Sequence, residues 1–113
     1  MMNCLMRLRP ALRVNYQPLS VANIQDIKQH YLDEGGQSLA LGMIRLIRAE
    51  IALLSEHPYK APAYEFAPGV RRLVVANGSY LVFYRVTQVV EILHVRRSER
   101  VPATGKDLES NPG

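Results

Sequence analysis

The side chains of this chain that are best suited to chemistry are basic and lie close together near its C-terminal end. His94 is followed by Arg96, Arg97 and Arg100. An imidazole can act as a general base or acid, and guanidinium groups can stabilise the charge of a phosphorane or bind an anionic partner. Catalysis also requires a partner group within hydrogen-bond reach of the imidazole. We therefore expect the three arginines to bind another macromolecule, and catalysis by His94, Arg96, Arg97 and Arg100 is the alternative.

Basic residues are unevenly distributed along the 113 residues. The whole chain has 14 Lys and Arg against 10 Asp and Glu, which gives a formal net charge of +4. Residues 57–100 hold seven of these bases against Glu65, Glu91 and Glu99, whereas residues 14–56 hold three bases against five acids. This asymmetry favours an acidic or anionic partner for the C-terminal half.

Nothing in the sequence points to a cofactor. Cys4 is the single cysteine, so no internal disulfide can form, and no cluster of His, Cys and carboxylate residues has the spacing of a metal site. A glycine-rich phosphate loop is absent as well. The first residues lack the apolar run of a secretory signal, and no segment is long and apolar enough to span a membrane. We therefore expect a cytoplasmic protein that uses neither a metal nor a cofactor.

Two amphipathic helices are predicted in the N-terminal half, after a short strand at residues 12–16. Residues 19–34 repeat apolar side chains at helical spacing, and Gly35-Gly36 ends this helix. The second helix ends at His57-Pro58. Its apolar stripe contains Ala40, Met43, Ile44, Ile47, Ile51 and Leu54. Three further leucines broaden this stripe, so we expect the helix to be buried on more than one side. They are Leu39, Leu46 and Leu53.

Three strands are predicted in the C-terminal half, at about 70–76, 79–87 and 89–96, after a proline-rich loop at 57–68. Asn77-Gly78 favours a tight hairpin turn because both of its central positions require φ > 0. The predicted fold class is α+β, in the order β-α-α-β-β-β, with the helical hairpin packed on one face of a small, mainly antiparallel sheet. Residues 12–100 form a single domain in this prediction, with an N-terminal extension at 1–11 and a flexible tail at 101–113.

Apolar residues occupy both faces of the two central predicted strands. In the first, Tyr80, Val82, Tyr84 and Val86 alternate with Leu81 and Phe83; in the second, Val90 and Ile92 oppose Leu93 and Val95. Two helices can cover only one face, so the other is expected to expose an apolar patch of the kind that marks a partner site. Arg85 lies on the predicted strand at 79–87 and needs a partner for its charge. Glu91 on the neighbouring strand is the candidate.

The C-terminal strands resemble those of a known family. Residues 69–73 (GVRRL), 80–86 (YLVFYRV) and 90–95 (VEILHV), with Arg100 and the element order, resemble the ParE/RelE superfamily of type II toxin–antitoxin toxins, often called plasmid stabilisation proteins. The resemblance implies a toxin that a cognate antitoxin, of the ribbon-helix-helix type, inactivates by wrapping around it. Operator DNA would be bound only through the antitoxin. The residues expected to contact the antitoxin are Tyr80, Val82, Tyr84 and Arg72.

The superfamily divides by target into ParE-like inhibitors of DNA gyrase and RelE-like endonucleases that cut mRNA on the ribosome. In RelE-like nucleases the central strands carry lysines and an arginine, and a tyrosine or histidine lies close to the C-terminus. This chain has Leu81 where such nucleases tend to place an arginine, and no lysine between Lys60 and Lys106. The resemblance therefore favours gyrase inhibition without catalysis; mRNA cleavage and a degenerate, non-toxic member are the alternatives. Target contacts are expected from Arg71, Arg96, Arg97 and Arg100.

Overall fold

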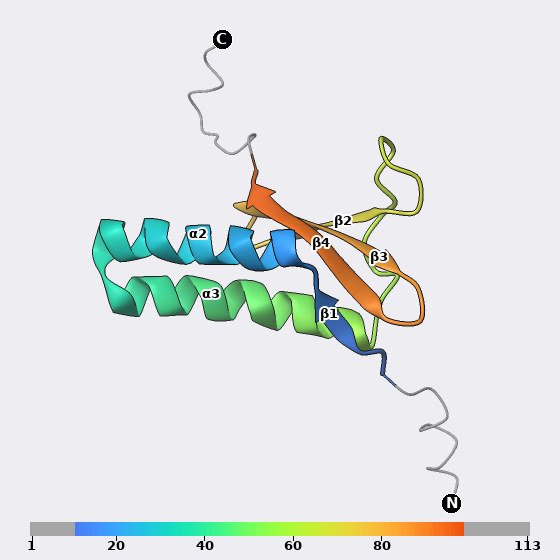
Figure 1. Cartoon of the computed structure of the whole chain (residues 1–113), viewed down its shortest axis with the longest axis horizontal. Helices are drawn as coiled ribbons and strands as arrows, with labels where there is room; N and C mark the ends of the chain where they lie inside the picture. The colour runs from blue at the N-terminus through green and yellow to red at the C-terminus, as the bar shows by residue number, and fades with distance from the viewer. Residues whose placement is uncertain (1–10, 99–113) are drawn as a thin grey trace, which may run out of the picture.

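The computed structural model describes residues 11–98, whose strands and helices follow the predicted order (Figure 1). Strand β1 (Val14–Tyr16) is followed by helix α2 (Pro18–Gly35), helix α3 (Gln37–Ala52) and a short 3-10 helix η1 (Leu53–Ser55). Strands β2 (Arg71–Val75), β3 (Tyr80–Val86) and β4 (Val90–Arg97) complete the fold. Apart from Ala11, the predicted extension at 1–11 and the tail at 101–113 lie outside the described residues, as does Arg100.

The four strands form one sheet in the order β1-β4-β3-β2. β1 runs parallel to β4, and the β4–β3 and β3–β2 pairs are antiparallel. Helices α2 and α3 form an antiparallel hairpin that lies against one side of the sheet, and the turn end of the hairpin projects beyond it (Figure 1). The predicted α+β fold class is confirmed.

The boundaries of the two helices follow from local residue types. Pro18 occupies the first turn of α2, where its missing N–H costs no hydrogen bond. Gly36 has a φ of 90° and separates α2 from α3, and its N–H donates to the carbonyl oxygen of Leu32 at 3.0 Å. Among residues 11–98, neither these helices nor η1 is long and apolar enough to cross a bilayer.

The core lies between the helical hairpin and the sheet. The helices contribute Ile24, Ile27, Ile47 and Ile51, and the strands contribute Leu73, Val75, Tyr80, Val82, Tyr84, Val90, Ile92 and Val95. The exposed fractions of Tyr80, Val82 and Tyr84 are 2%, 0% and 0%. These three residues, which the resemblance assigned to antitoxin contact, therefore point toward the helices and are part of the core.

A β-bulge changes which residues of β4 face the core. Phe83 pairs with His94 and Tyr84 pairs with Ile92, so Leu93 is an extra residue in β4. The bulge shifts the alternation of side chains by one position. Ile92 and Val95 are consequently both buried in the core, although simple alternation placed them on opposite faces. Apolar residues that simple alternation would place on both faces of β4 are thus buried together in the core.

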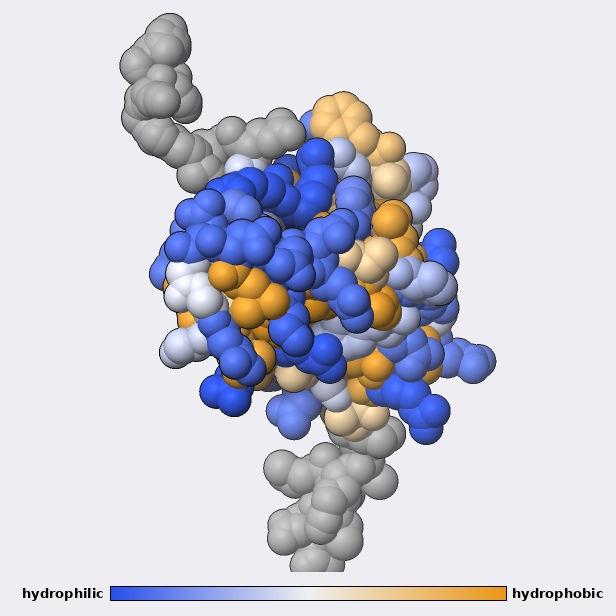
Figure 2. Space-filling view, turned by 60° about the vertical axis from the view of Figure 1, so that its left-hand side comes forward, coloured by the Kyte–Doolittle hydropathy of each residue, from blue (hydrophilic) through white to orange (hydrophobic). Residues whose placement is uncertain are grey.

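One flank of α3 exposes apolar residues along most of its length. Leu39, Leu46 and Leu53 have exposed fractions of 45%, 40% and 51%, so the prediction that they are buried is wrong. Gly42 and Ala49 lie between them and are exposed as well. We call the set of Leu39, Gly42, Leu46, Ala49 and Leu53 the α3 stripe. Figure 2, which brings the hairpin end of the molecule forward, shows hydrophobic patches between hydrophilic side chains on this side.

The hairpin between β2 and β3 is held in place by a side chain of α3. Ala76 and Asn77 have φ values of 54° and 56°, and Gly78 has 91°, so the positive-φ stretch begins one residue earlier than Asn77-Gly78 suggested. The backbone N–H of Ala76 donates to Glu50 Oε2 at 2.9 Å. Ala76 is 4% exposed, which places this N–H where water cannot readily replace its acceptor.

Replacing Glu50 by alanine is expected to lower the free energy of unfolding by about 1–3 kcal/mol, because the buried N–H of Ala76 loses its acceptor. Glu50→Gln keeps an acceptor oxygen and should cost less than Glu50→Ala. Urea denaturation followed by circular dichroism measures both values. Equal losses in the two variants would show that the hydrogen bond does not stabilise the hairpin.

Candidate interaction surface at the end of strand β4

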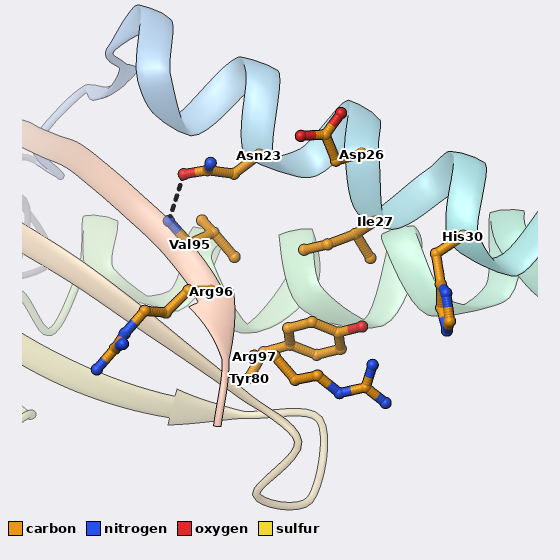
Figure 3. Close-up of a pocket in the computed structure, with 8 residues that line it drawn as sticks. All are labelled: Asn23, Asp26, Ile27, His30, Tyr80, Val95, Arg96 and Arg97. Carbon is orange, nitrogen blue, oxygen red and sulfur yellow. Dashed lines mark hydrogen bonds between the residues drawn. The ribbon is translucent and has the colours of Figure 1, made fainter. Parts of the chain in front are cut away.

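The two described arginines at the end of β4 lie on opposite sides of the sheet. Arg96 pairs with Leu81 and lies over the ring of Phe83, 5.5 Å from its centroid, on the face away from the helices. Arg97 pairs with Tyr80, whose side chain is in the core, and the Arg97 guanidinium lies near the Tyr80 ring on the helix side (Figure 3). Successive strand residues point to opposite faces, so adjacent arginines here serve two different surfaces.

Arg97 lines a shallow cleft between β4 and α2 (Figure 3). Its volume is about 280 Å³. The lining residues are Asn23, Asp26, Ile27 and His30 from α2 and Tyr80, Val95, Arg96 and Arg97 from the sheet. Asn23 joins the two walls, because its Oδ1 accepts a hydrogen bond from the N–H of Val95 at 3.0 Å. The cleft combines an acid, an imidazole and the guanidinium of Arg97, which suits a polypeptide partner with charges of both signs.

The contribution of α2 to this cleft was not predicted from the sequence. The structure places the α2 residues His30 and Asp26 in the lining of the same cleft as Arg97 (Figure 3). A signal was present, because Asn23, Asp26, Ile27 and His30 recur at i, i+3, i+4 and i+7 and therefore share one helix face. Only the position of β4 against α2 reveals that this face meets the arginines.

Tyr80 closes the bottom of the cleft and is not available as an exposed contact. Its hydroxyl donates to the hydroxyl of Tyr31 at 3.1 Å. Burial, assisted by this hydrogen bond, raises the pKa of Tyr80 well above its usual value, although Arg97 acts in the opposite direction. Tyr84 is similarly engaged, with its hydroxyl donating to the carbonyl oxygen of Pro58 at 2.8 Å. Antitoxin contact by Tyr80, Val82 and Tyr84 stays a prediction, and the structure gives it almost no exposed surface.

Tyrosine burial predicts a loss of stability at alkaline pH. Burial raises the pKa of Tyr16, Tyr80 and Tyr84 in the folded protein above the unfolded value of about 10. A raised pKa means that the neutral phenol is favoured by folding, so this stability is complete below about pH 10 and falls as pH rises further. Urea denaturation at pH 8 and pH 11 should show the decline. Tyr80→Phe should reduce it, and an unchanged decline would exclude Tyr80 as a cause.

Arg71 lies apart from the arginines of β4. It pairs with Tyr84 on β3, whereas Arg97 pairs with Tyr80, and β2 and β4 lie on opposite sides of β3. Its guanidinium donates to the carbonyl oxygen of Ala61 at 2.6 Å and lies 4.9 Å from the ring centroid of Tyr59. These contacts fix the loop before β2 to the sheet. The structure therefore does not unite Arg71 with the predicted target-binding residues Arg96 and Arg97.

The sheet face away from the helices is partly covered by the loop between η1 and β2. Tyr64 of this loop packs against Phe83 with ring centroids 5.0 Å apart, and Phe83 is only 8% exposed. Arg72 and His94 flank Phe83 on the neighbouring strands. The predicted open apolar flank is thus smaller than expected, because the chain covers its central phenylalanine.

One prediction about a charged group can be checked directly in residues 11–98. Arg85 forms an ion pair with Glu91 at 2.8 Å, which confirms the predicted partner. Within the same residues no group of three or more His, Cys, Asp and Glu side chains could hold a metal ion. His94 stacks on Phe83 with ring centroids 5.9 Å apart, so its ring packs beside the arginines rather than in the cleft.

Comparison with known proteins places these features in context. A family model described as "ParE toxin of type II toxin-antitoxin system, parDE" matches residues 14–102. The chain is 36% identical over 75 residues to Toxin ParE1 of Caulobacter vibrioides, an alignment covering 66% of this chain and 76% of that protein.

Two solved structures share the fold. A structure of the chromosomal ParDE TA system from P. aeruginosa matches with a TM-score of 0.70 at 22% identity. The match covers 78% of this chain and 97% of the chain in that structure. The isolated E. coli RelE toxin matches with a TM-score of 0.59 at 13% identity. This match covers 88% of this chain and 97% of the RelE chain.

Proposed function

Because the chain belongs to the ParE toxin family of type II toxin–antitoxin systems, we propose that it inhibits DNA gyrase and is neutralised by a cognate antitoxin. Family membership carries the toxin assignment. The gyrase target is supported by the residue types on the sheet, since residues 61–98 contain no lysine and Leu81 stands on the central strand β3. A metal-free nuclease needs a general base that is free to reach the substrate, and on the sheet face away from the helices the candidate base His94 is stacked on Phe83.

Gyrase binding is assigned to the end of β4. Arg97 and the α2 residues Asp26 and His30 form a cleft with charges of both signs, which fits a protein surface better than a nucleic-acid backbone. Arg96 extends the basic surface to the other side of the sheet, and Arg71 and Arg100 stay predicted contacts. Arginine is a frequent energetic centre of protein interfaces. The toxin therefore acts by binding, and it requires no cofactor.

Replacing Arg97 by alanine is expected to raise the toxin concentration that half-inhibits gyrase supercoiling by about tenfold or more, because it removes an interface guanidinium. The chain should remain folded, since Arg97 is exposed. Supercoiling and cleavage-complex assays with purified gyrase measure the effect. Arg85→Ala is the matched control, since Arg85 is an exposed arginine paired with Glu91. Wild-type protein without any effect on gyrase at micromolar concentration would refute the proposed target.

Ribosome-dependent mRNA cleavage is the alternative activity, with His94 and the neighbouring arginines as the site. Primer extension on cellular mRNA after induction of the toxin detects such cleavage. Loss of the cleavage products in His94→Ala would assign catalysis to this residue. Normal growth after induction without antitoxin would instead indicate a degenerate, non-toxic member of the family.

The α3 stripe is the surface that we assign to the antitoxin. Its residues are spaced by three and four, as on one face of a helix that packs against a second helix. A Cβ built on Gly42 would meet no atom within 4 Å, so the stripe is open at this glycine. Gly42 and Ala49 between the leucines permit close approach of a partner backbone. An amphipathic antitoxin helix satisfies these requirements, and a ribbon-helix-helix domain attached to it would bring operator DNA to the complex.

A further inference from the structure

The cleft between α2 and the end of β4 has polar groups at both ends and an apolar middle (Figure 3). Asn23 lies at one end, and His30 and Arg97 lie toward the other. Between them lie the side chain of Ile27, which is 8% exposed, and the ring of Tyr80, which is 2% exposed. A ligand for this cleft therefore needs polar atoms at two separated points and an apolar portion between them, which an extended stretch of polypeptide provides.

The guanidinium of Arg97 has no partner among the described residues. Within residues 11–98 no carboxylate lies within ion-pair distance of Arg97, and no acceptor forms a hydrogen bond with it. Arg85, by contrast, is paired with Glu91 at 2.8 Å. A guanidinium presents its N–H groups as a planar fork that matches the two oxygens of a carboxylate. The charge of Arg97 is thus available to a carboxylate of another molecule.

Two further hydrogen-bond donors in the lining lack acceptors. The side chain of Asn23 binds Val95 through Oδ1 alone, so the N–H groups on Nδ2 have no acceptor within residues 11–98. The ring of His30 packs edge-on against Tyr31, with centroids 4.8 Å apart, and the same residues offer no acceptor to its ring nitrogens. An imidazole carries at least one N–H donor. The free groups at both ends of the cleft are therefore donors, and a ligand with acceptor oxygens satisfies them.

Two other charged residues of the lining do not compete for this ligand. Asp26 lies at the rim with its carboxylate directed away from Arg97 (Figure 3). Arg96 points away from the cleft, and its guanidinium lies over the ring of Phe83 on the other face of the sheet. Arg97 therefore supplies the guanidinium at this end of the cleft. One such charge balances a carboxylate, whereas a phosphate carries about two negative charges at neutral pH.

We propose that the cleft binds a glutamate-containing segment of the target protein. The glutamate carboxylate accepts hydrogen bonds from Arg97, its methylene groups lie on Ile27 and the ring of Tyr80, and a backbone carbonyl of the segment accepts from Nδ2 of Asn23. The identity of the target rests on the proposed function, whereas the chemistry of the ligand rests on the cleft. An aspartate has a shorter side chain and covers less of the apolar middle.

Peptide binding to the toxin alone tests the ligand chemistry without gyrase. The isotope-labelled full-length chain is titrated with a capped peptide of sequence Gly-Leu-Glu-Glu-Gly and with its neutral counterpart Gly-Leu-Gln-Gln-Gly, and amide resonances are followed by nuclear magnetic resonance. We expect the glutamate peptide to bind with a Kd of about 0.1–5 mM and to shift the side-chain amide of Asn23 and the backbone amide of Val95. The glutamine peptide should bind at least about fivefold more weakly, because it brings no charge to Arg97.

Two substitutions and one control assign binding to the cleft. Arg97→Gln removes the guanidinium and should weaken binding of the glutamate peptide at least about fivefold. Asn23→Asp keeps an oxygen for the N–H of Val95 but removes the Nδ2 donor and adds a negative charge, so it should weaken binding about fivefold as well. Arg85→Gln removes an exposed arginine that Glu91 already neutralises and should change the Kd less than about twofold. Circular dichroism verifies that each variant is folded.

The proposal would be overturned by equal binding of the glutamate and glutamine peptides, or by no shift at about 20 mM peptide. Tighter binding of inorganic phosphate than of the glutamate peptide, or equal losses for Arg97→Gln and Arg85→Gln, would overturn it as well. Gyrase assays separate this result from the proposed function. If the toxin inhibits supercoiling but the peptide results fail, the target stands and the ligand chemistry is wrong. If the glutamate peptide binds as expected but supercoiling is unchanged, the ligand chemistry stands and the target is another protein.

Discussion

Ile47→Ala is expected to lower the free energy of unfolding by about 2–5 kcal/mol, the range found when a large buried aliphatic side chain is truncated. Ile47 is 0% exposed and belongs to the core cluster that joins the hairpin to the sheet. Removing three carbon atoms leaves a cavity that close-packed neighbours cannot fill without moving. Equilibrium unfolding in urea or guanidinium chloride, followed by circular dichroism, measures the change.

The adjacent leucine provides the control for this experiment. Leu46 has the same number of carbon atoms as Ile47 but is 40% exposed, since it points into the α3 stripe. Leu46→Ala should therefore cost less than about 1 kcal/mol, within the usual range for surface substitutions. Similar losses at both positions would mean that the orientation of α3 against the sheet is wrong. Ile51→Ala, also 0% exposed, should behave like Ile47→Ala.

Leu46→Asp is expected to weaken binding of the cognate antitoxin by about a hundredfold while leaving the toxin folded. The substitution places a carboxylate at the centre of the α3 stripe, where a partner helix would have to bury it without a counter-charge. The free toxin tolerates the change because the side chain at this position is in contact with water. Isothermal titration calorimetry with the antitoxin measures the affinity, and loss of neutralisation in growing cells provides an independent readout.

A second exposed leucine separates a specific effect from a general one. Leu19 lies in the first turn of α2, outside the α3 stripe, and is 55% exposed. Leu19→Asp introduces the same charge into the other helix and should change antitoxin affinity less than about threefold, a difference well below 1.4 kcal/mol. If both variants bound normally, the antitoxin would lie elsewhere, and the sheet face around Arg72 and Phe83 would be the next surface to test.

Residue spacing in the sequence determined the order and type of the elements. Helical repeats of apolar residues, the Gly35-Gly36 break and the Asn77-Gly78 turn act over a few neighbouring residues, so their effect is legible without the rest of the chain. The pairing of Arg85 with Glu91 could be predicted for a similar reason, since a short hairpin sets its register. The two arginines at the end of β4 were also recognised as a surface feature from their sequence alone.

Which side chains are buried depends on which elements pack against each other, and this is determined only by the tertiary structure. The sequence could not show that β3 turns Tyr80, Val82 and Tyr84 toward the helices, because its other face, with Leu81 and Phe83, is also apolar. The bulge at Leu93 moved Val95 to the core side, and a loop residue, Tyr64, covered Phe83 from the opposite side.

The same reason explains the surface of the helices. Leu46 continues the apolar pattern of α3, yet the sheet and α2 occupy only part of the circumference of that helix, so this leucine faces solvent. His30 and Arg97 line the same cleft because α2 lies beside the end of β4. Local patterns fix what each element is, whereas contacts between distant residues fix which of its sides remains free to bind a partner.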